Sequence, residues 1–363
     1  MASKTVTTHN QKKELNSTSR KKRHVRIRLT TLTAATSNYQ YLILISLILL
    51  LVILSSLTDT RFLRFSNIMN VVKQTSVLAI VGIGMTFVLI SGGVDLSVGS
   101  NIAFASAVGV LVFRSNGNAL MSMISIVLAA SFLGLVNGIN IGVLKITPFM
   151  ATLSTLILGR GLTLFLLNAE SVPVKSPLFL WIGQADLGPF PVVLLVMLIL
   201  YICGLFMLQR TIFGRRSFAV GANRSAARAV GINVEHQLVL IYLLSGFIAG
   251  LAAVVTIGRL SSVQPWAAQG LEFEVITAVV IGGTSLMGGK GSLLGTFLGS
   301  ILIGTLSNYL TFIDIPAYHL RIVRGAILII AVGIDRLGII YREKLEVSLS
   351  QESWSEDKAS EAS

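Results

Sequence analysis

Charged side chains that interrupt the apolar runs of this chain are the residues most able to do chemistry. Asp95 lies in SGGVDLSVGS between two long apolar runs, and Arg160 lies in LGRGL inside another. A charge at the centre of an apolar span costs about 2.5–3.5 kcal/mol to insert, so it normally faces a partner or a wet cavity. The other candidates are two carboxylates in GLEFEV and four neutral hydrogen-bonding residues: Glu272, Glu274, Asn137, Asn140, Thr152 and Thr155.

Several common catalytic patterns do not occur in this sequence. It has no H-E-x-x-H, no spaced Cys/His set and no G-x-S-x-G, and its single cysteine, Cys203, excludes an intramolecular disulfide. GGTSLMGGKGS resembles a phosphate-binding loop, but the motif ending at Lys290 needs Gly at 284 and Ser or Thr at 291. Those positions hold Thr284 and Gly291. If the chain pumps a solute, the energy therefore comes from a partner or an ion gradient.

Composition predicts the elements that must position these residues. The chain has 363 residues, of which 53% are hydrophobic and 12% charged, and its mean hydropathy is +0.79. Apolar runs of about 18 residues recur along most of its length, which indicates an all-α polytopic membrane protein. We expect ten spans: 40–57, 68–91, 96–113, 119–144, 148–167, 191–208, 237–259, 271–286, 292–312 and 317–334. Of these, 271–286 is short, and 317–334 is interrupted by two arginines.

The distribution of charge predicts the orientation. The formal net charge is +13, and the first 38 residues hold nine Lys or Arg against one acid, Glu14. Although such a tail could bind nucleic acid, it ends directly at an apolar run, which favours a cytoplasmic flank attracted to anionic lipid, with no nucleic-acid partner. Ten spans then place both termini in the cytoplasm. We divide the chain into a basic tail (1–38), a membrane domain (39–340) and a disordered tail (341–363).

The polar segment 209–236 differs from the other connections. It is basic and rich in alanine, and Gly214, Gly221 and Gly231 bracket its short stretches. This pattern predicts one or two short helices on the cytoplasmic face. Small residues also recur at helix-contact spacing, which favours close helix packing in a bilayer: Gly134, Gly138, Gly142, Gly246, Gly250, Gly295 and Gly299.

Several motifs in order resemble the permease subunits of ribose-type ABC sugar importers. They are GGVDLSVGS, LKITPFMATLSTLILGRG, FGRRSFAVGANRSAARAVGIN, LSGFIAGLAAVV and QPWAAQGLEFEVITAVVIGGTSLMGGKGS. The resemblance covers roughly residues 60–336. It implies a cobalamin-importer-like permease fold in the bacterial inner membrane, and a homodimer or heterodimer served by a cytoplasmic ATPase and an extracytoplasmic solute-binding protein. It implies no cofactor in this chain, since the ATPase would bind ATP and magnesium.

The resemblance also implies roles for particular residues. GANRSAARAVGI would be the segment that couples to the ATPase. Arg228 could form a salt bridge there or simply reflect the positive charge of the cytoplasmic side. The coupling residues implied by the resemblance are Gly221, Asn223, Ala226, Ala227, Arg228, Gly231 and Ile232. The family often has Asp where this chain has Glu274. The polar residues named above are candidates for lining or gating the pathway, or for bonds between helices. Permeases for nucleosides or branched-chain amino acids remain alternatives. A proton-coupled transporter needs mid-span carboxylates, and Asp95, Glu272 and Glu274 are expected to be too peripheral.

Asp95 itself has two interpretations. Gly92 and Gly93 permit the positive φ angles of a sharp reversal after the second span. Asp95 would then cap the amides that open the third span, with Ser97 as a competing cap. The alternative is a role in gating or in ion pairing with a partner.

Overall fold

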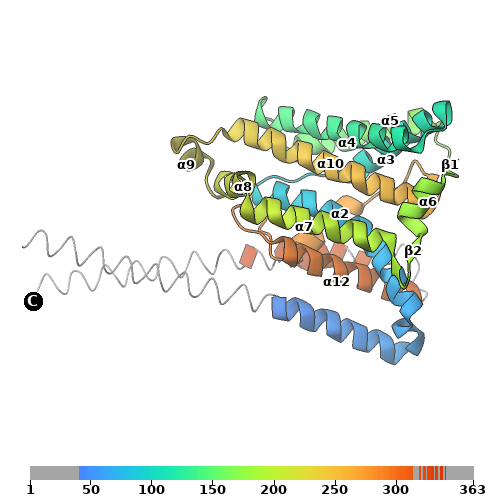
Figure 1. Cartoon of the computed structure of the whole chain (residues 1–363). Coiled ribbons are helices and arrows are strands. Elements are labelled where there is room, and N and C mark those ends of the chain that lie inside the picture. Colours follow the sequence, from blue (N-terminus) through green and yellow to red (C-terminus); the bar gives the residue numbers. More distant parts are fainter. Residues whose placement is uncertain are drawn as a thin grey trace, which may run out of the picture.

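Long helices that lie side by side make up most of the molecule (Figure 1). The computed structural model describes residues 41–313, together with single residues and short runs between 319 and 340. Within this part, eight helices are long and apolar enough to cross a membrane, which confirms the all-α polytopic class. They are Tyr41–Thr58, α2 (Phe65–Ile90), α3 (Val98–Asn116), α4 (Ala119–Gly142), α5 (Pro148–Leu167), α7 (Val192–Arg210), α10 (Val234–Leu260) and α12 (Leu293–Phe312).

The ninth expected span is different. Helix α11 covers only Leu271–Ile281, 11 residues, and a helix of that length is about 16 Å long, roughly half of the hydrocarbon thickness. Two adjacent glycines, Gly282 and Gly283, follow its last residue and begin a glycine-rich turn. The expectation of a full span over 271–286 is therefore wrong. The tenth expected span and both tails lie outside the continuously described residues.

The remaining elements are short and lie at the helix ends. The short helices are η1 (Thr60–Leu63), α6 (Pro177–Gln184), α8 (Ile212–Ala222) and α9 (Arg224–Ala229). Strand β1 (Val172–Pro173) pairs with β4 (Ser262–Val263), and β2 (Asp186–Leu187) pairs with β3 (Phe190–Pro191), both antiparallel. Helices α8 and α9 lie at one end of the bundle, and α6 with the strands lies at the other (Figure 1).

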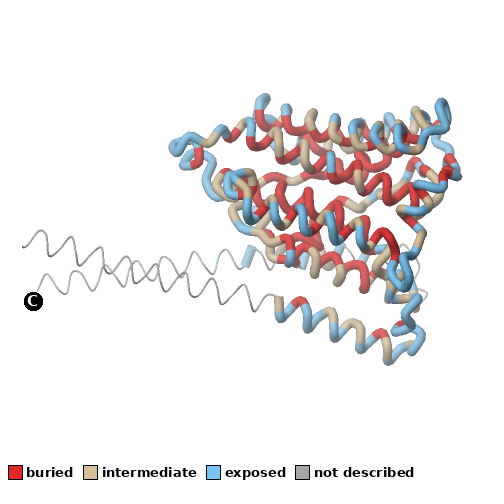
Figure 2. The backbone as a smooth tube through the Cα atoms, viewed as in Figure 1, coloured by how far each residue is buried: buried red, intermediate tan, exposed pale blue. Residues whose placement is uncertain are grey.

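Glycines on α4 and α10 form the tightest helix pair. A Cβ atom on Gly134 would meet backbone atoms of Gly246, and one on Gly250 would meet Val127. Backbones this close gain dispersion contacts, which drive helix association in lipid where the hydrophobic effect does not. The packing role expected for these glycines is confirmed. Buried residues follow this pair and α2 through the middle of the molecule (Figure 2).

The first helix stands at the edge of the bundle. Its window is only 11% buried, and Figure 2 shows it mostly exposed. Tyr41 shares a hydrogen bond with Ser292 at 2.8 Å, and Thr58 shares one with Tyr309 at 3.2 Å. These two contacts fix its ends against the chain segment around α12.

Candidate functional site

The connection between α2 and α3 carries Asp95 into the interior. Gly92 has φ +75°, as the predicted reversal requires, whereas Gly93 is not among the positive-φ residues. Asp95 is 2% exposed. Its Oδ1 accepts from the amide of Ser97 at 3.0 Å and from the Ser97 hydroxyl at 2.6 Å. The predicted capping contact is therefore present, at the residue just before α3.

The second carboxylate oxygen makes a contact that the sequence did not predict. Ser245 of α10 donates its hydroxyl to Asp95 Oδ2 at 2.8 Å. Ser245 lies 11 residues after Val234, the first of the 27 residues of α10, so it is about 16 Å along that helix. Asp95 thus lies level with the middle of a long span. The expectation that Asp95 is too peripheral for a mid-span carboxylate is wrong.

Two further helices join the same hydrogen-bond network. Asn137 of α4 donates to the Ser97 hydroxyl at 2.8 Å, and Thr155 of α5 donates to Asn137 Oδ1 at 2.6 Å. Ser97 makes no side-chain cap bond, so the expectation of Ser97 as a competing cap is wrong. The chain of contacts Ser245–Asp95–Ser97–Asn137–Thr155 joins three helices to the α2–α3 connection, and we call it the buried network.

The other predicted polar residues of α4 and α5 lie beside this network. Thr152 donates to Pro148 O at 2.8 Å and reaches Val94 O at 3.4 Å. Asn140 is only partly buried and does not join the network. Asp95, Asn137, Thr152 and Thr155 are all nearly inaccessible. In this conformation they tie elements together and are closed off from solvent by the described part of the chain.

Arg160 holds a connection that turns back into the bundle. Its Nη1 donates to the carbonyl oxygens of Pro265 at 2.6 Å and of Ala267 at 3.0 Å. Arg160 also lies within electrostatic reach of Glu272. The guanidinium therefore fixes the segment between β4 and α11 in place, so the structural role expected for Arg160 is present.

The two glutamate side chains of α11 lie in different surroundings. Glu272 is buried against the first turn of α3, where a Cβ on Gly99 would lie 2.5 Å from Oε2. Among the described residues Oε2 has no hydrogen-bond partner. The positive end of the α3 dipole favours a carboxylate there. Glu274 faces elsewhere, into a cavity between α2, α10, α11 and α12.

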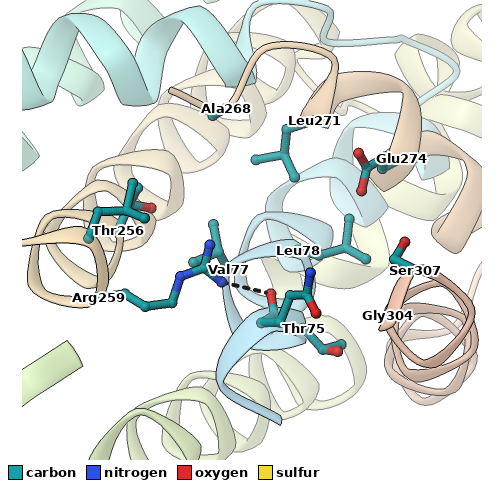
Figure 3. A pocket seen from close by; sticks show the side chains of 12 residues that line it. Thr75, Val77, Leu78, Thr256, Arg259, Ala268, Leu271, Glu274, Gly304 and Ser307 are labelled. Carbon is teal, nitrogen blue, oxygen red and sulfur yellow. Dashed lines mark hydrogen bonds between the residues drawn. The ribbon is translucent and has the colours of Figure 1, made fainter. Parts of the chain in front are cut away.

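We call that space the four-helix cavity; its volume is about 180 Å³. Figure 3 shows its lining side chains converging from the four helices. The polar ones are Gln74, Thr75, Thr256, Arg259, Glu274 and Ser307. Within the described part of the chain, no group of three or more His, Cys, Asp or Glu side chains could hold a metal ion.

Segment 209–236 forms two short helices, α8 and α9, in agreement with the one or two that were predicted. Asn223 caps α9 by accepting from the amide of Ala226 at 2.9 Å. Ala227 is buried, whereas Ala226 and Gly231 are exposed and Ile232 is partly buried. Arg228 pairs with Glu235 of the same chain at 2.7 Å, so its ion pair in this conformation is internal.

Gly221 connects these helices to the core. A Cβ atom at Gly221 would overlap the carbonyl oxygen of Ile90, the last residue of α2. The same carbonyl accepts from the amide of Gly289 at 2.8 Å. The glycine-rich loop that resembles a phosphate loop is therefore packed against α2 and α8. Ile90, the residue of α2 in this backbone junction, lies five residues before Asp95.

Sequence reasoning missed several residues of these sites. Ser245 and Tyr242, which donates to Val94 O at 3.2 Å, gave no signal because their partners lie far away in sequence. No sequence pattern predicted Thr75 and Arg259 of the cavity either. Val230 is 76% exposed at the end of α9. An isolated valine between Arg228 and Gly231 in a polar segment was a signal that could have identified it.

Comparison with known proteins places these features in a family. Residues 67–332 match the family described as the permease component of the branched-chain amino acid transport system. The chain is 36% identical over 296 residues to the ribose import permease protein RbsC of Escherichia coli K12, covering 80% of this chain and 92% of that one. It is 36% identical over 287 residues to RbsC of Bacillus subtilis 168, covering 78% and 89%.

A third relative is named for another sugar. The D-allose transport system permease protein AlsC of Escherichia coli K12 is 35% identical over 286 residues, covering 78% of this chain and 88% of that one. No solved structure matches the chain. The match to the family covers most of the sequence, including the buried network, the four-helix cavity and both short helices. The chain therefore belongs to the family of transport-system permease components and is a multi-pass membrane protein.

Proposed function

We propose that this chain is the membrane-spanning subunit of an ATP-driven importer for a monosaccharide or a related small polyhydroxylated solute. The names of its relatives support the substrate class, since ribose and allose permeases match at 35–36% identity over most of their length. ATP would be hydrolysed by a separate cytoplasmic subunit. An extracytoplasmic solute-binding protein would deliver the solute, and a second permease, identical or related, would complete the pathway.

One observation carries the coupling part of the proposal. The short helices α8 and α9 project from one end of the bundle, and α8 contacts the end of α2 through the backbone at Gly221 and Ile90. A displacement of α8 therefore acts directly on the segment that leads to Asp95. The exposed tip around Val230 would seat in a groove of the ATPase, with Asn223, Ala226, Gly231 and Ile232 shaping it.

The orientation follows from this role. The end that carries α8 and α9 would face the cytoplasm, in agreement with its basic residues Arg215, Arg216 and Arg224. The opposite end, with α6 and the strands, would face outward and receive the solute-binding protein. The N-terminal tail, which leads to Tyr41 beside Ser292 at that end, would also be cytoplasmic, and a cytoplasmic C-terminus requires the further crossing expected over 317–334.

Reconstitution tests the proposal. The chain is placed in proteoliposomes with the ATPase and the binding protein encoded beside it, and uptake of radiolabelled D-ribose, D-allose and D-xylose is measured. We expect uptake of at least one sugar that requires ATP and is blocked by vanadate. Uptake of L-leucine or a nucleoside, with none of the sugars, would instead favour the alternative substrates, for which the family description gives some support.

A proton-coupled secondary transporter is the second candidate, because the buried Asp95 lies level with the middle of α10. Against it, both oxygens of Asp95 are already hydrogen-bonded within the chain. Uptake driven by a proton gradient without ATP would support this candidate and contradict the proposal.

A further inference from the structure

A groove lined by aliphatic side chains lies between the first helix, Tyr41–Thr58, and α12. Its volume is about 380 Å³, and every described side chain that lines it is leucine or isoleucine. The first helix and α12 each contribute a stripe of leucines at helical spacing. The leucines of the two stripes are Leu47, Leu50, Leu51, Leu54, Leu302 and Leu306. We call this space the aliphatic groove.

The aliphatic groove is open to the surroundings of the protomer. The first helix is held by hydrogen bonds at its two ends, from Tyr41 to Ser292 and from Thr58 to Tyr309, and Figure 1 shows it at the edge of the bundle. Between those ends, Leu50 is 52% exposed and Leu54 is 49% exposed. A molecule from the bilayer can therefore reach the groove without any rearrangement of the chain.

The groove lies at the depth of lipid acyl chains. Leu47 and Leu54 lie six and 13 residues after Tyr41, so they are about 9 and 20 Å along the helix from that residue. The hydrocarbon of a bilayer is about 30 Å thick, so each leaflet supplies about 15 Å. Membrane helices associate through close packing, and side chains that face a void lose dispersion contacts. An acyl chain is the apolar molecule that is present at this depth and can restore those contacts.

Positive charge at the Tyr41 end of the groove selects the headgroup. The first 38 residues carry nine Lys or Arg against one acid, and Lys290 is exposed in the loop that leads into α12. Basic residues next to a membrane span attract anionic lipids. The other end of the first helix is followed by Arg61 and Arg64, and Arg61 is paired with Asp59 at 2.6 Å. An anionic headgroup therefore fits best at the Tyr41 end.

We propose that the aliphatic groove binds one acyl chain of an anionic phospholipid, whose phosphate is attracted by Lys290 and by the basic residues that precede Tyr41. The lipid packs the first helix against α12 between the two hydrogen-bonded ends of that helix. This inference requires only that the chain spans a membrane, so it is independent of the proposed function. A second copy of the chain is the alternative occupant, and the experiments below distinguish the two.

Native mass spectrometry of the full chain tests the site. Wild type, Leu50→Trp and Leu49→Trp are purified in mild detergent and titrated with equal amounts of phosphatidylglycerol and phosphatidylethanolamine. Leu49 and Leu50 are 56% and 52% exposed on the same helix, and only Leu50 lines the groove. An indole at position 50 would occupy the groove. We expect the fraction of chains that retain a phospholipid to fall severalfold in Leu50→Trp and to match wild type in Leu49→Trp.

The choice between the two phospholipids provides a second readout that leaves the groove unchanged. We expect wild type to prefer phosphatidylglycerol by about fivefold or more, the effect of one cation near the headgroup. Changing the basic residues between Arg20 and Arg28 to glutamine, together with Lys290→Gln, should reduce that preference severalfold. The total amount of bound phospholipid should fall much less than in Leu50→Trp.

Three results would overturn the lipid site. Equal retention by wild type and Leu50→Trp would show that the lipid binds elsewhere, and equal losses in Leu50→Trp and Leu49→Trp would show general coating of the helix. Equal affinity of wild type for the two phospholipids would remove the role of the anionic headgroup. In a Cys203→Ser background, disulfide-linked dimers of Leu50→Cys but not of Leu49→Cys in native membranes would assign the groove to a second copy of the chain.

Discussion

The hydroxyl of Ser245 donates to the carboxylate of Asp95 at 2.8 Å and ties the α2–α3 connection to the middle of α10. The two residues are 150 positions apart. The bond closes one end of the buried network, and Thr155 closes the other. The carboxylate is thus a joint between helices that come from distant parts of the chain.

Substitutions at Asp95 and Ser245 should lower stability in a fixed order. A hydrogen bond to a charged group contributes about 1.5–3 kcal/mol, and a buried group left unpaired costs more. We expect thermal unfolding midpoints in detergent to fall from wild type through Ser245→Ala and Asp95→Asn to Asp95→Ala. The double variant Asp95→Asn/Ser245→Ala should lose less than the sum of its parts. Additive losses would contradict the shared bond.

The same Asp95→Asn variant separates the two interpretations of the residue. The amide keeps the shape and one acceptor oxygen while removing the charge. Normal sugar uptake at normal membrane abundance would leave a structural role alone, whereas lost uptake in a well-folded variant would support gating.

Thr155→Val should weaken the contact between α5 and α4. The change leaves Asn137 Oδ1 without its 2.6 Å donor, and hydrogen bonds between membrane helices contribute on average about 0.6 kcal/mol and at most about 1.7 kcal/mol. Thr163→Val, which removes a bond within α5 alone, is the control. Equal unfolding midpoints for both variants would contradict a role for Thr155 in joining helices.

Arg160→Met should loosen the segment between β4 and α11. The variant removes both donors to Pro265 O and Ala267 O and leaves the nearby Glu272 without a compensating charge. Hydrogen exchange followed by mass spectrometry should show faster exchange over 261–270, with little change in α8 and α9. Exposed Arg114→Met serves as the control, and unchanged exchange over 261–270 would rule out the anchoring role.

Gly221→Ala should disable transport by moving α8. The new methyl group would overlap Ile90 O, a backbone atom that cannot rotate away. Gly161→Ala is the matched control, since a Cβ there meets nothing within 4 Å and alanine in a helix gains about 0.5–1 kcal/mol over glycine. We expect ATP-dependent uptake to be lost in the first variant and kept in the second. Uptake retained by Gly221→Ala would contradict the junction.

Val230→Asp should uncouple the chain from the proposed ATPase. The charge would replace the exposed Val230 at the end of α9, where burial against a partner penalises a charge. Co-purification of the ATPase and ATP-dependent uptake should both fall, while membrane abundance stays the same. Asn116→Asp adds a charge at the exposed end of α3 as a control. Val230→Asp is also a cleaner test than a bulky residue at Gly231, whose φ of +81° would strain any side chain.

The sequence predicted what local patterns determine and missed what distant contacts determine. Eight of the expected spans and the two short helices over 209–236 follow from hydropathy, glycine placement and capping residues such as Asn223. Asp95 was placed too close to the surface because a glycine-rich polar stretch normally marks a membrane boundary. Its depth is made possible by Ser245 and Tyr242 of α10. The early end of α11 was missed because Gly282, Gly283 and Thr284 are small residues that also occur within membrane helices.

The junction of Gly221, Ile90 and Gly289 is made of backbone atoms. This contact requires that residue 221 has no side chain, and it involves no side-chain atom of Ile90 or Gly289. Segment 209–236 should therefore be exchangeable between permeases, provided that the donor supplies a glycine at the position of Gly221 and keeps the contacts of Phe213 with Phe87 and of Ser217 with Gln237. Under the proposed function, a chimera built on that rule would change which ATPase binds the permease without redesign of the membrane domain.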